Sequence, residues 1–430
     1  MIEKKKVGKT TVPQRWRFFD AFLRLRAFEA LRYREYRLIW YGQLSASMGT
    51  WMDEVTRGWL IYELTDSAVQ LGLVRGVQAI PFLLLSPLAG SAADRYSRKT
   101  QLLVAQLANA LIFAATALLI FTEQIRPWHV YVTAFLTAIV QVFQQPARTA
   151  MVSDAVPPGH LTNAIGLNAL MYNVSRSTGP ALAGVLIAVF GTGGAYSVQA
   201  VFFFLATVWT LQLRPVRRAS TGAGGHAAPR ESFGQSIIEG WKFSWRSEAV
   251  RTGLLCTMLA SLFIAPFTTL LPVFARDLLG VGANGQGFLL TAMGVGALCS
   301  AILIASAGDK FPRGMLMLGS ATLYGVIVMI FAASPGFQLS LVMMGIAGLC
   351  HVHSNALVQT VIQSYSPSEF RGRTTAIFSM NQALVTAGSM LIGASALLLG
   401  PRWAMASMGA VGSLAMIMIY VTMPRARHIR

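Results

Sequence analysis

Hydrophobic residues along this chain gather in long blocks that short polar connections separate. Each block has about the 20 residues that a helix needs to cross a bilayer. The blocks lie at 38–62, 68–93, 100–122, 127–148, 162–190, 193–213, 250–274, 284–307, 315–333, 337–362, 374–399 and 403–423. The pattern predicts an all-α membrane protein with twelve transmembrane helices.

Composition agrees with that class. Of the 430 residues, 54% are hydrophobic and only 12% are charged, whereas a soluble protein carries about 25% charged residues. A net charge of +18 could indicate nucleic acid, but a nucleic-acid-binding protein gathers its charge on one polar domain. Here most of the 35 Lys and Arg residues fall in connections assigned to one side of the membrane. We therefore expect this charge to meet anionic membrane lipids and not nucleic acid.

The same charges predict the orientation, because positive residues near the ends of a span resist translocation. The short connections assigned to the outside carry only two basic residues, Arg126 and Arg402. These connections are 63–67, 123–126, 191–192, 334–336 and 400–402. An even number of spans and two basic termini predict a multi-pass protein of the cell inner (plasma) membrane with both termini in the cytoplasm.

Changes in composition divide the chain into five segments. Residues 1–36 form a basic, amphipathic segment, expected to lie on the inner leaflet. An N-terminal six-helix bundle follows at 37–213, and a C-terminal six-helix bundle occupies 250–423. The Gly/Ala-rich cytoplasmic linker 214–249 joins them and ends in a short amphipathic piece, Ile237–Trp245. Residues 424–430 are a cytoplasmic tail.

A charged turn follows the second apolar block. Gly90, Asp94, Arg95, Arg98 and Lys99 stand at the spacing G-x-x-x-D-R-x-x-R-K. A lone turn of this composition is usually a solvated helix cap. This spacing, however, resembles the signature loop of major facilitator superfamily transporters, a loop that acts as a conformational switch.

The second half of the chain contains a partial repeat of this charged turn. Asp309 and Arg313 follow the eighth apolar block as Asp94 and Arg98 follow the second. Two parallel repeats of six helices are what an alternating-access transporter needs, because one half can rock against the other around a central site. The resemblance therefore implies the major facilitator fold, with two six-helix repeats.

Five charged residues lie inside apolar blocks and away from the ends of those blocks: Asp53, Glu54, Arg57, Arg75 and Arg176. A charge at the bilayer centre costs roughly 2.5–3.5 kcal/mol, so we expect these side chains to face the protein interior and to pair with one another. Asp53 and Arg57 are four positions apart and share a helix face. Two interpretations stay open: a structural ion-pair network, or proton coupling and gating through Asp53 or Glu54.

The fifth block contains Gly179, Pro180 and Gly184. Their order resembles the G-P-x-x-x-G part of a motif found in exporting, proton-antiporting facilitators. The run from Gln145 to Gly184, with Arg371-Gly372-Arg373, is similar to the efflux branch that includes the enterobactin exporter and macrolide-efflux proteins.

This resemblance assigns a role to the charged turn. It implies that Asp94 meets the N-terminus of the eleventh helix, where the helix dipole is positive, and that Arg95 and Arg98 complete the cluster. Ala92 and Ser97 depart from the usual aliphatic residue and glycine of the signature loop.

Polar and aromatic residues at similar depth are candidates for a substrate cavity. A buried histidine is more often a satisfied core residue than a proton carrier, and an aromatic stripe is more often plain packing. No metal site is expected, because the two histidines at 351 and 353 have no carboxylate near them in the sequence. No cofactor is expected either. The candidate residues of the substrate cavity are Trp51, Asn168, Asn173, His351, Asn355 and Asn381.

These observations predict a monomeric transporter that exports a small amphipathic molecule, such as a drug-like compound, a macrolide or a siderophore, in exchange for protons. Its partners are the small-molecule substrate, protons and membrane lipids. A lipid-moving facilitator, as in the related lysophospholipid facilitators, is the alternative within transport. A membrane enzyme or receptor is disfavoured, because the sequence has no nucleotide-binding loop, no supported nucleophile–base pair and no sizeable soluble domain.

Overall fold

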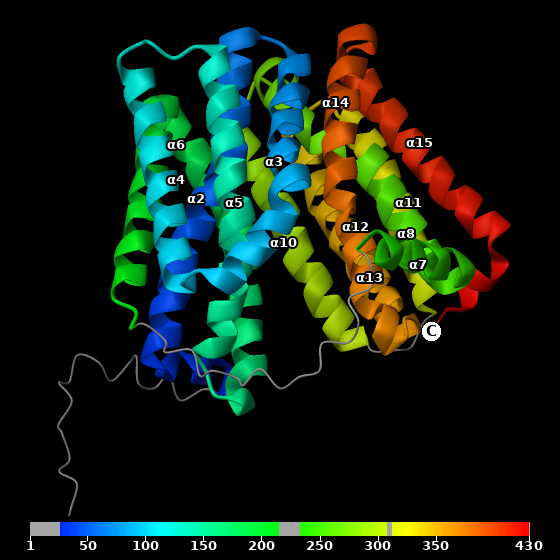
Figure 1. The fold of residues 1–430 in the computed structure, drawn as a ribbon. Coiled ribbons are helices and arrows are strands. Elements are labelled where there is room, and N and C mark those ends of the chain that lie inside the picture. The colour runs from blue at the N-terminus through cyan, green and yellow to red at the C-terminus, as the bar shows by residue number, and fades with distance from the viewer. Residues whose placement is uncertain (1–25, 215–232, 308–311, 430) are drawn as a thin grey trace, which may run out of the picture.

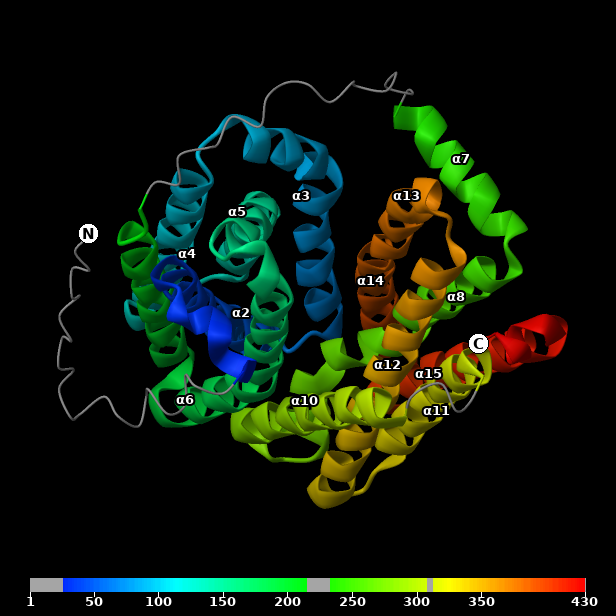
Figure 2. The same ribbon diagram turned by 90° about the horizontal axis from the view of Figure 1, so that it is seen from below.

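The computed structural model describes residues 26–214, 233–307 and 312–429, and all regular secondary structure in those residues is helical. Long helices run side by side and roughly antiparallel (Figure 1). Viewed along the helix axes, the helices of the first half gather on one side and most of those of the second half on the other (Figure 2). This arrangement follows from long apolar segments joined by short connections.

The first half begins with a short 3-10 helix and continues with long α-helices. Its elements are η2 (Arg26–Arg32), α2 (Arg34–Thr65), α3 (Ala68–Arg95), α4 (Arg98–Phe121), α5 (Pro127–Asp154), η3 (Pro158–His160) and α6 (Leu161–Leu211). Most of the basic segment predicted at 1–36 lies outside the described residues, which begin at residue 26.

The second half has more breaks in its helices. Its elements are α7 (Phe233–Arg246), α8 (Glu248–Leu259), η4 (Ala260–Ile264), η5 (Ala265–Leu270), α9 (Leu271–Val273), η6 (Phe274–Leu278), α10 (Gly282–Ala307), α11 (Arg313–Ala333), α12 (Phe337–Tyr365), α13 (Ser368–Ser379), α14 (Asn381–Leu399), α15 (Pro401–Thr422) and η7 (Pro424–His428).

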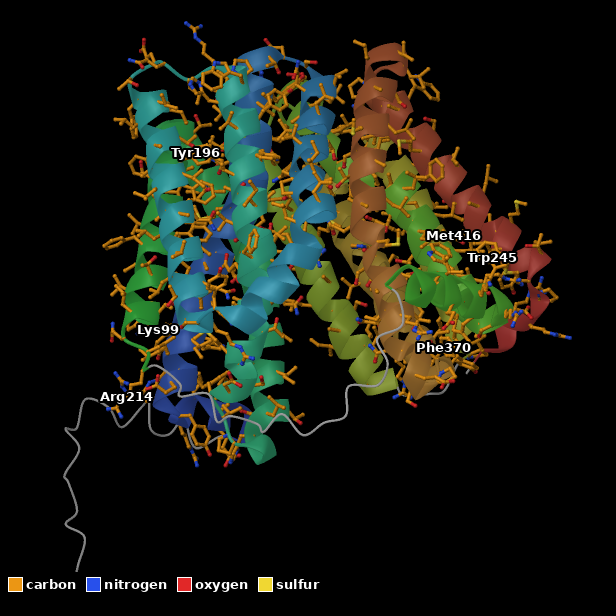
Figure 3. All side chains as sticks on the ribbon, viewed as in Figure 1. Lys99, Tyr196, Arg214, Trp245, Phe370 and Met416 are labelled. Atoms are coloured by element: carbon orange, nitrogen blue, oxygen red, sulfur yellow. The ribbon has the colours of Figure 1, made fainter. Side chains whose placement is uncertain are left out.

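The helices define two ends of the molecule. We call the end with the connections 66–67, 122–126, 279–281, 334–336 and Gly400 the short-loop end. The opposite end, which carries Lys99, Arg214 and Phe370 (Figure 3), is called the basic end.

α6 is a single element by its hydrogen-bond pattern, whereas the sequence predicts two membrane spans over the same residues. The chain breaks at Gly191, whose φ of 69° and ψ of 178° are not helical. Gly179 before the break and Phe203 after it both contact α2 around residues 49–51. The two arms of α6 therefore run back along each other, as the separate apolar blocks 162–190 and 193–213 predict.

The expected span 250–274 is the least regular helix. α8 continues through π and 3-10 turns to Leu278. Pro266 and Pro272 lie in this stretch, and each proline removes a backbone donor and disturbs the preceding turn. The stretch that we expected to begin at residue 374 starts earlier, at Ser368, and is divided between α13 and α14 at Met380.

Among the described residues, eight helical stretches are long and apolar enough to cross a membrane. They are Arg98–Phe121, Leu161–Leu211, Glu248–Leu278, Gly282–Ile304, Arg313–Ala333, Phe337–Tyr365, Ser368–Leu399 and Pro401–Thr422.

The short amphipathic piece that the sequence predicts before the second bundle lies in α7. α7 packs against α13 at the basic end: the rings of Phe243 and Phe370 stack with centroids 4.6 Å apart, and Arg373 pairs with Glu239 at 2.5 Å. Trp245 of α7 lies on the same side of the molecule as Phe370 (Figure 3) and is half-exposed. The predicted flexible part of the linker, at 215–232, lies outside the described residues.

Candidate functional site

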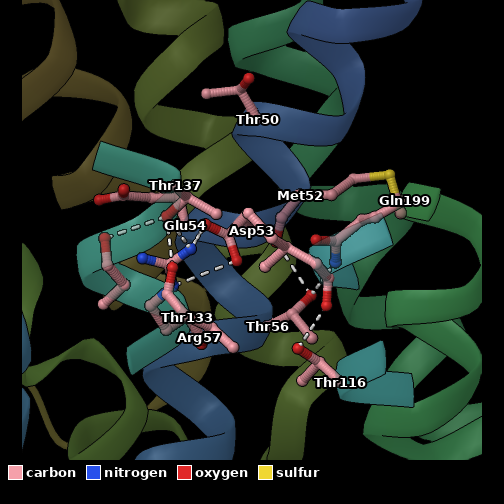
Figure 4. A network of polar contacts seen from close by, with 12 residues as sticks. Thr50, Met52, Asp53, Glu54, Thr56, Arg57, Thr116, Thr133, Thr137 and Gln199 are labelled. Carbon is pink, nitrogen blue, oxygen red and sulfur yellow. Dashed lines mark hydrogen bonds and ion pairs between the residues drawn. The ribbon is translucent and has the colours of Figure 1, made fainter. Parts of the chain in front are cut away.

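A buried ion pair lies in the middle of α2. The Arg57 guanidinium donates to both carboxylate oxygens of Asp53, with an Nε–Oδ1 distance of 3.3 Å, and Nη2 also donates to Thr137 of α5 at 2.9 Å. The Arg57 and Asp53 side chains are 5% and 13% exposed. Figure 4 shows this network among the threonines of the neighbouring helices. The pairing predicted from the four-residue spacing is confirmed.

A second ion pair joins α2 to α3. Arg75 of α3 makes a two-pronged contact with Glu54, with an Nη1–Oε2 distance of 2.8 Å. Two parallel charge-assisted hydrogen bonds fix the orientation of both side chains. Asp53 and Glu54 are sequence neighbours, so the two pairs form one layer of alternating charge. We call it the charge layer; it joins α2 to α3 and to α5.

This charge layer borders a cavity of about 40 Å³ between the two halves of the chain. The first half supplies Asp53, Glu54, Arg57 and Arg75, and the second half supplies polar residues of the proline-interrupted helix and of α10. Two buried atoms of lining residues, Arg57 Nη1 and Gln286 Oε1, have no hydrogen-bond partner among the described residues. The volume and these two polar atoms suit a bound water. The second-half lining residues are Thr268, Thr269, Pro272, Gln286 and Leu290.

Arg176 differs from the other four membrane charges. Its guanidinium lies over the ring of Trp51, 5.4 Å from the centroid. Among the described residues it has neither an ion-pair nor a hydrogen-bond partner. The expected mutual pairing therefore holds for Asp53, Arg57, Glu54 and Arg75 only.

Polar contacts join the two halves at the short-loop end. Arg276, just before α10, pairs with Asp66 at 2.7 Å and lies over the ring of Tyr62 at 5.3 Å. The Tyr62 hydroxyl donates to Asp277. The sequence analysis missed these residues, because short connections have no periodicity that could indicate which of them meet.

The glycine–proline motif of α6 lies against α10. A Cβ placed on Gly184 would approach the backbone oxygen of Ala283 to 2.6 Å, and one placed on Gly287 would approach that of Pro180 to 2.6 Å. Only glycine permits this approach of two helix backbones. A Cβ placed on Gly179 would come within 2.7 Å of the Cβ of Trp51 in α2. The motif thus joins the two halves.

The charged turn is described only in part. Gly90 lies in α3, but the side chains of Asp94 and Arg95 and all of Asp309 lie outside the described residues. Arg98 pairs with Asp154 at the end of α5.

The other described charges of this region lie at helix ends. Lys99 donates to the backbone oxygens of Leu211 and Leu213 at 2.9 and 2.5 Å, where a cation satisfies the free carbonyls of a helix end. In the second half Arg313 is the first residue of α11. Arg98 and Lys99 thus tie together the basic ends of α4, α5 and α6.

A second polar cavity, of about 20 Å³, lies within the second half. His351 stacks on Tyr324 with ring centroids 5.2 Å apart. In the part of the chain that the structure describes, His351 Nδ1 and the Tyr324 hydroxyl are both buried without a hydrogen-bond partner. Asn355, one turn along α12 from His351, also lines this cavity. The structure therefore brings His351 and Asn355 together, and adds Tyr324.

The remaining candidates lie elsewhere. Asn168 accepts a hydrogen bond from the Tyr36 hydroxyl at 3.3 Å, between α2 and α6 near the basic end. Asn173 donates to the backbone of Ala169 within its own helix, and Asn381 is the first residue of α14. None of the three lines either polar cavity described above.

A wide, open hollow of about 520 Å³ lies at the basic end, on α12 and α13. Arg371 and Gly372, which belong to the Arg-Gly-Arg run of the sequence, contribute to its wall together with Gln363, Ser364 and Thr375. Polar contacts and close helix packing thus join the halves at the short-loop end, while the described surface of the second half is hollowed at the basic end.

The chain is similar to known transporters in sequence and in fold. The Staphyloferrin A transporter of Staphylococcus aureus (strain NCTC 8325 / PS 47) is 23% identical over 80% of this chain and 85% of its own length. The multidrug efflux pump Tap of Mycolicibacterium fortuitum is 25% identical over 83% and 88%. A crystal structure of a bacterial homologue of the human lysosomal transporter Spinster, inward-facing and occupied, superimposes with a TM-score of 0.69 and 17% identity over 92% of this chain and 97% of that one.

The family model described as transmembrane secretion effector matches residues 26–428, nearly the whole chain. The chain therefore belongs to the transmembrane secretion effector family of the major facilitator superfamily of transporters.

Proposed function

We propose that this protein is a secondary active transporter that exports a small amphipathic molecule in exchange for protons. The observation that carries the proposal is the charge layer of Asp53, Arg57, Glu54 and Arg75, which borders a cavity between the two halves. Charges inside a membrane protein mark ion and substrate pathways when they face its interior.

The proposed organisation is twelve transmembrane helices in two six-helix repeats. Bundles at 37–213 and 250–423 are joined by a cytoplasmic linker at 214–249, between the N-terminal segment 1–36 and the tail 424–430. The basic end faces the cytoplasm of the bacterial cell, as the distribution of Lys and Arg favours, and the protein works as a monomer among membrane lipids. The reversal of α6 at Gly191 supports counting that helix as two spans.

In this orientation the described state is inward-facing. Contacts at the short-loop end, including Asp66–Arg276 and the close approach of Gly184 to α10, close the outer side. The hollow on α12 and α13 opens toward the cytoplasm.

The charge layer lies directly beneath the outer closure, where a proton could change its stability. Protonation of Asp53 would remove the negative charge of the pair and leave Arg57 with only neutral hydrogen-bond partners, the carboxylic acid of Asp53 and the hydroxyl of Thr137. An arginine without its counter-ion draws water or another anion into the cavity, which weakens packing between the halves. Proton uptake from outside would thereby be coupled to the change between inward- and outward-facing states.

The relatives' names support export. One relative is a transporter of staphyloferrin A, and another is a multidrug efflux pump. The proposed substrate class is accordingly a drug-like compound or a siderophore.

The test measures accumulation of ethidium, erythromycin and staphyloferrin A in cells with and without the gene, before and after a protonophore collapses the proton gradient. We expect the gene to lower accumulation of at least one compound, and the protonophore to abolish the difference. Asp53→Asn should abolish it as well, with protein still present in the membrane, because asparagine keeps the shape of the side chain but cannot carry a proton.

Glu123→Gln is the matched control, because Glu123 is an exposed carboxylate in the connection between α4 and α5. It should leave export unchanged. Export that survives the protonophore would overturn proton coupling, and unchanged export by Asp53→Asn would remove Asp53 from the mechanism.

A further inference from the structure

We propose that Arg176 is a binding site for the negatively charged group of the exported molecule, so that the substrate class is amphipathic organic anions. This proposal rests on the proposed transport function and adds the charge of the substrate. The first observation is charge balance. Of the five charges in this region, four neutralise one another as Asp53–Arg57 and Glu54–Arg75, and Arg176 alone has no described carboxylate partner.

A lone arginine near the middle of a membrane helix is unfavourable without a partner. Arg176 lies midway along the first arm of α6, between Leu161 and the break at Gly191. An anionic group of a substrate would supply the missing counter-charge, and it would be released when the cavity opens to water.

The second observation is the geometry around the guanidinium. The central carbon of the Arg176 guanidinium lies over the Trp51 ring, and Tyr172 meets the same indole ring edge-on with centroids 5.6 Å apart. A guanidinium held over an aromatic ring keeps its N–H donors, which can bind a carboxylate or sulfonate through two hydrogen bonds. The aromatic rings beside it suit an apolar or aromatic body attached to that anion.

The third observation is the position of Arg176 at the boundary between the halves. Ser177, the next residue, packs on Gly294 of α10, where an added Cβ would come within 2.5 Å of the Ser177 Oγ. In the second half, Tyr324 and His351 line the 20 Å³ cavity. Within the described residues, the buried Tyr324 hydroxyl and His351 Nδ1 have no hydrogen-bond partner. A substrate held by Arg176 could therefore present polar groups to the second half at the same time.

The test uses two fluorescent probes that share their rings and differ mainly in charge. 8-Anilinonaphthalene-1-sulfonate is an anion, and N-phenyl-1-naphthylamine is its neutral counterpart. Both are titrated against the full-length protein in phosphatidylcholine nanodiscs, and the signal of empty nanodiscs is subtracted. We expect the wild-type protein to bind the sulfonate about tenfold more tightly than the amine.

Arg176→Gln should weaken sulfonate binding by about tenfold and leave binding of the neutral probe unchanged, which also shows that the variant is folded. Arg176→Lys should retain part of the preference, because lysine keeps the charge but not the two-pronged geometry. Arg34→Gln is the control: it removes the same charge from a half-exposed position at the start of α2 and should change neither affinity.

Wild-type protein that binds the sulfonate no better than empty nanodiscs would overturn the proposal, as would Arg176→Gln that binds both probes like the wild type. The readout needs neither transport nor a proton gradient. Failure of proton-coupled export with sulfonate binding intact would therefore count against the proposed function alone.

Discussion

Arg276 reaches across the boundary between the two halves of the chain and pairs with Asp66, with an Nη1–Oδ1 distance of 2.7 Å. Asp66 lies in the two-residue connection between α2 and α3, and Arg276 lies in the last π turn before α10. Asp277, the next residue, accepts a hydrogen bond from Tyr62. Two consecutive residues of the second half thus hold the end of α2.

We expect Asp66→Asn to shift the protein toward the state that is open at the short-loop end. Asp66 is 72% exposed, so its ion pair contributes no more than about 1 kcal/mol and its loss changes the ratio of states by up to about fivefold. Spin labels at Trp128 and Leu398, which are exposed and lie at the short-loop end of different halves, should report longer distances. The native cysteines are replaced beforehand.

The control is Glu123→Gln, which removes a carboxylate from another short connection. A distance distribution that stays the same in Asp66→Asn would show that the pair plays no part in closure.

Gly184→Val should also open the short-loop end. The new side chain would collide with the backbone of α10, because even a Cβ would come within 2.6 Å of the Ala283 oxygen. Overpacking of this kind costs about 1–3 kcal/mol. The same pair of spin labels measures the shift.

Gly166→Val, in the same helix, has no atom within 4 Å of the new Cβ and should leave the distances unchanged. If both valine variants behave alike, then the contact between α6 and α10 does not decide which state is populated.

The sequence predicted the helices well where their apolar blocks were long and uniform. It also predicted the pairing of Asp53 with Arg57, because their spacing places both side chains on one face of a single helix. It could not show that Arg75 would pair with Glu54. Asp53 and Glu54 were both available, and only the packing of α3 on α2 decides between them.

Contacts between the halves were beyond sequence reasoning, and so were most side-chain partners within each half. Tyr324 is a single tyrosine in an apolar block, and nothing in the sequence marks it as a cavity residue. It nevertheless stacks on His351 and lines the second cavity. Asn168 had the polarity and depth of a cavity residue but bonds to Tyr36 instead. A polar residue in a membrane helix is stabilised by a polar partner, and the sequence does not say which helix provides one.

Removing one partner of the buried pair should destabilise the protein more than removing both. Arg57→Gln leaves Asp53 as an uncompensated buried charge, which costs about 3–5 kcal/mol. Asp53→Asn combined with Arg57→Gln leaves no such charge, and part of the stability should return. The midpoint of thermal unfolding in detergent measures the effect.

Arg34→Gln is the control for this double-mutant cycle. It removes a half-exposed ion-pair partner and should change stability by less than about 1 kcal/mol. Additive effects of the two substitutions at 53 and 57 would contradict a direct interaction between them.

Tyr324→Phe should separate stability from binding. The Tyr324 hydroxyl is buried without a partner, and removing a buried polar group that has no hydrogen bond does not lower stability. We therefore expect an unchanged or higher unfolding midpoint, with weaker binding of the anilinonaphthalene sulfonate.

Tyr62→Phe is the contrast, because its hydroxyl donates to Asp277 and its loss should lower the midpoint by the equivalent of about 1 kcal/mol. If Tyr324→Phe is destabilised as much as Tyr62→Phe, the Tyr324 hydroxyl has a partner in the protein, such as an ordered water in the 20 Å³ cavity, and is not held free for a substrate.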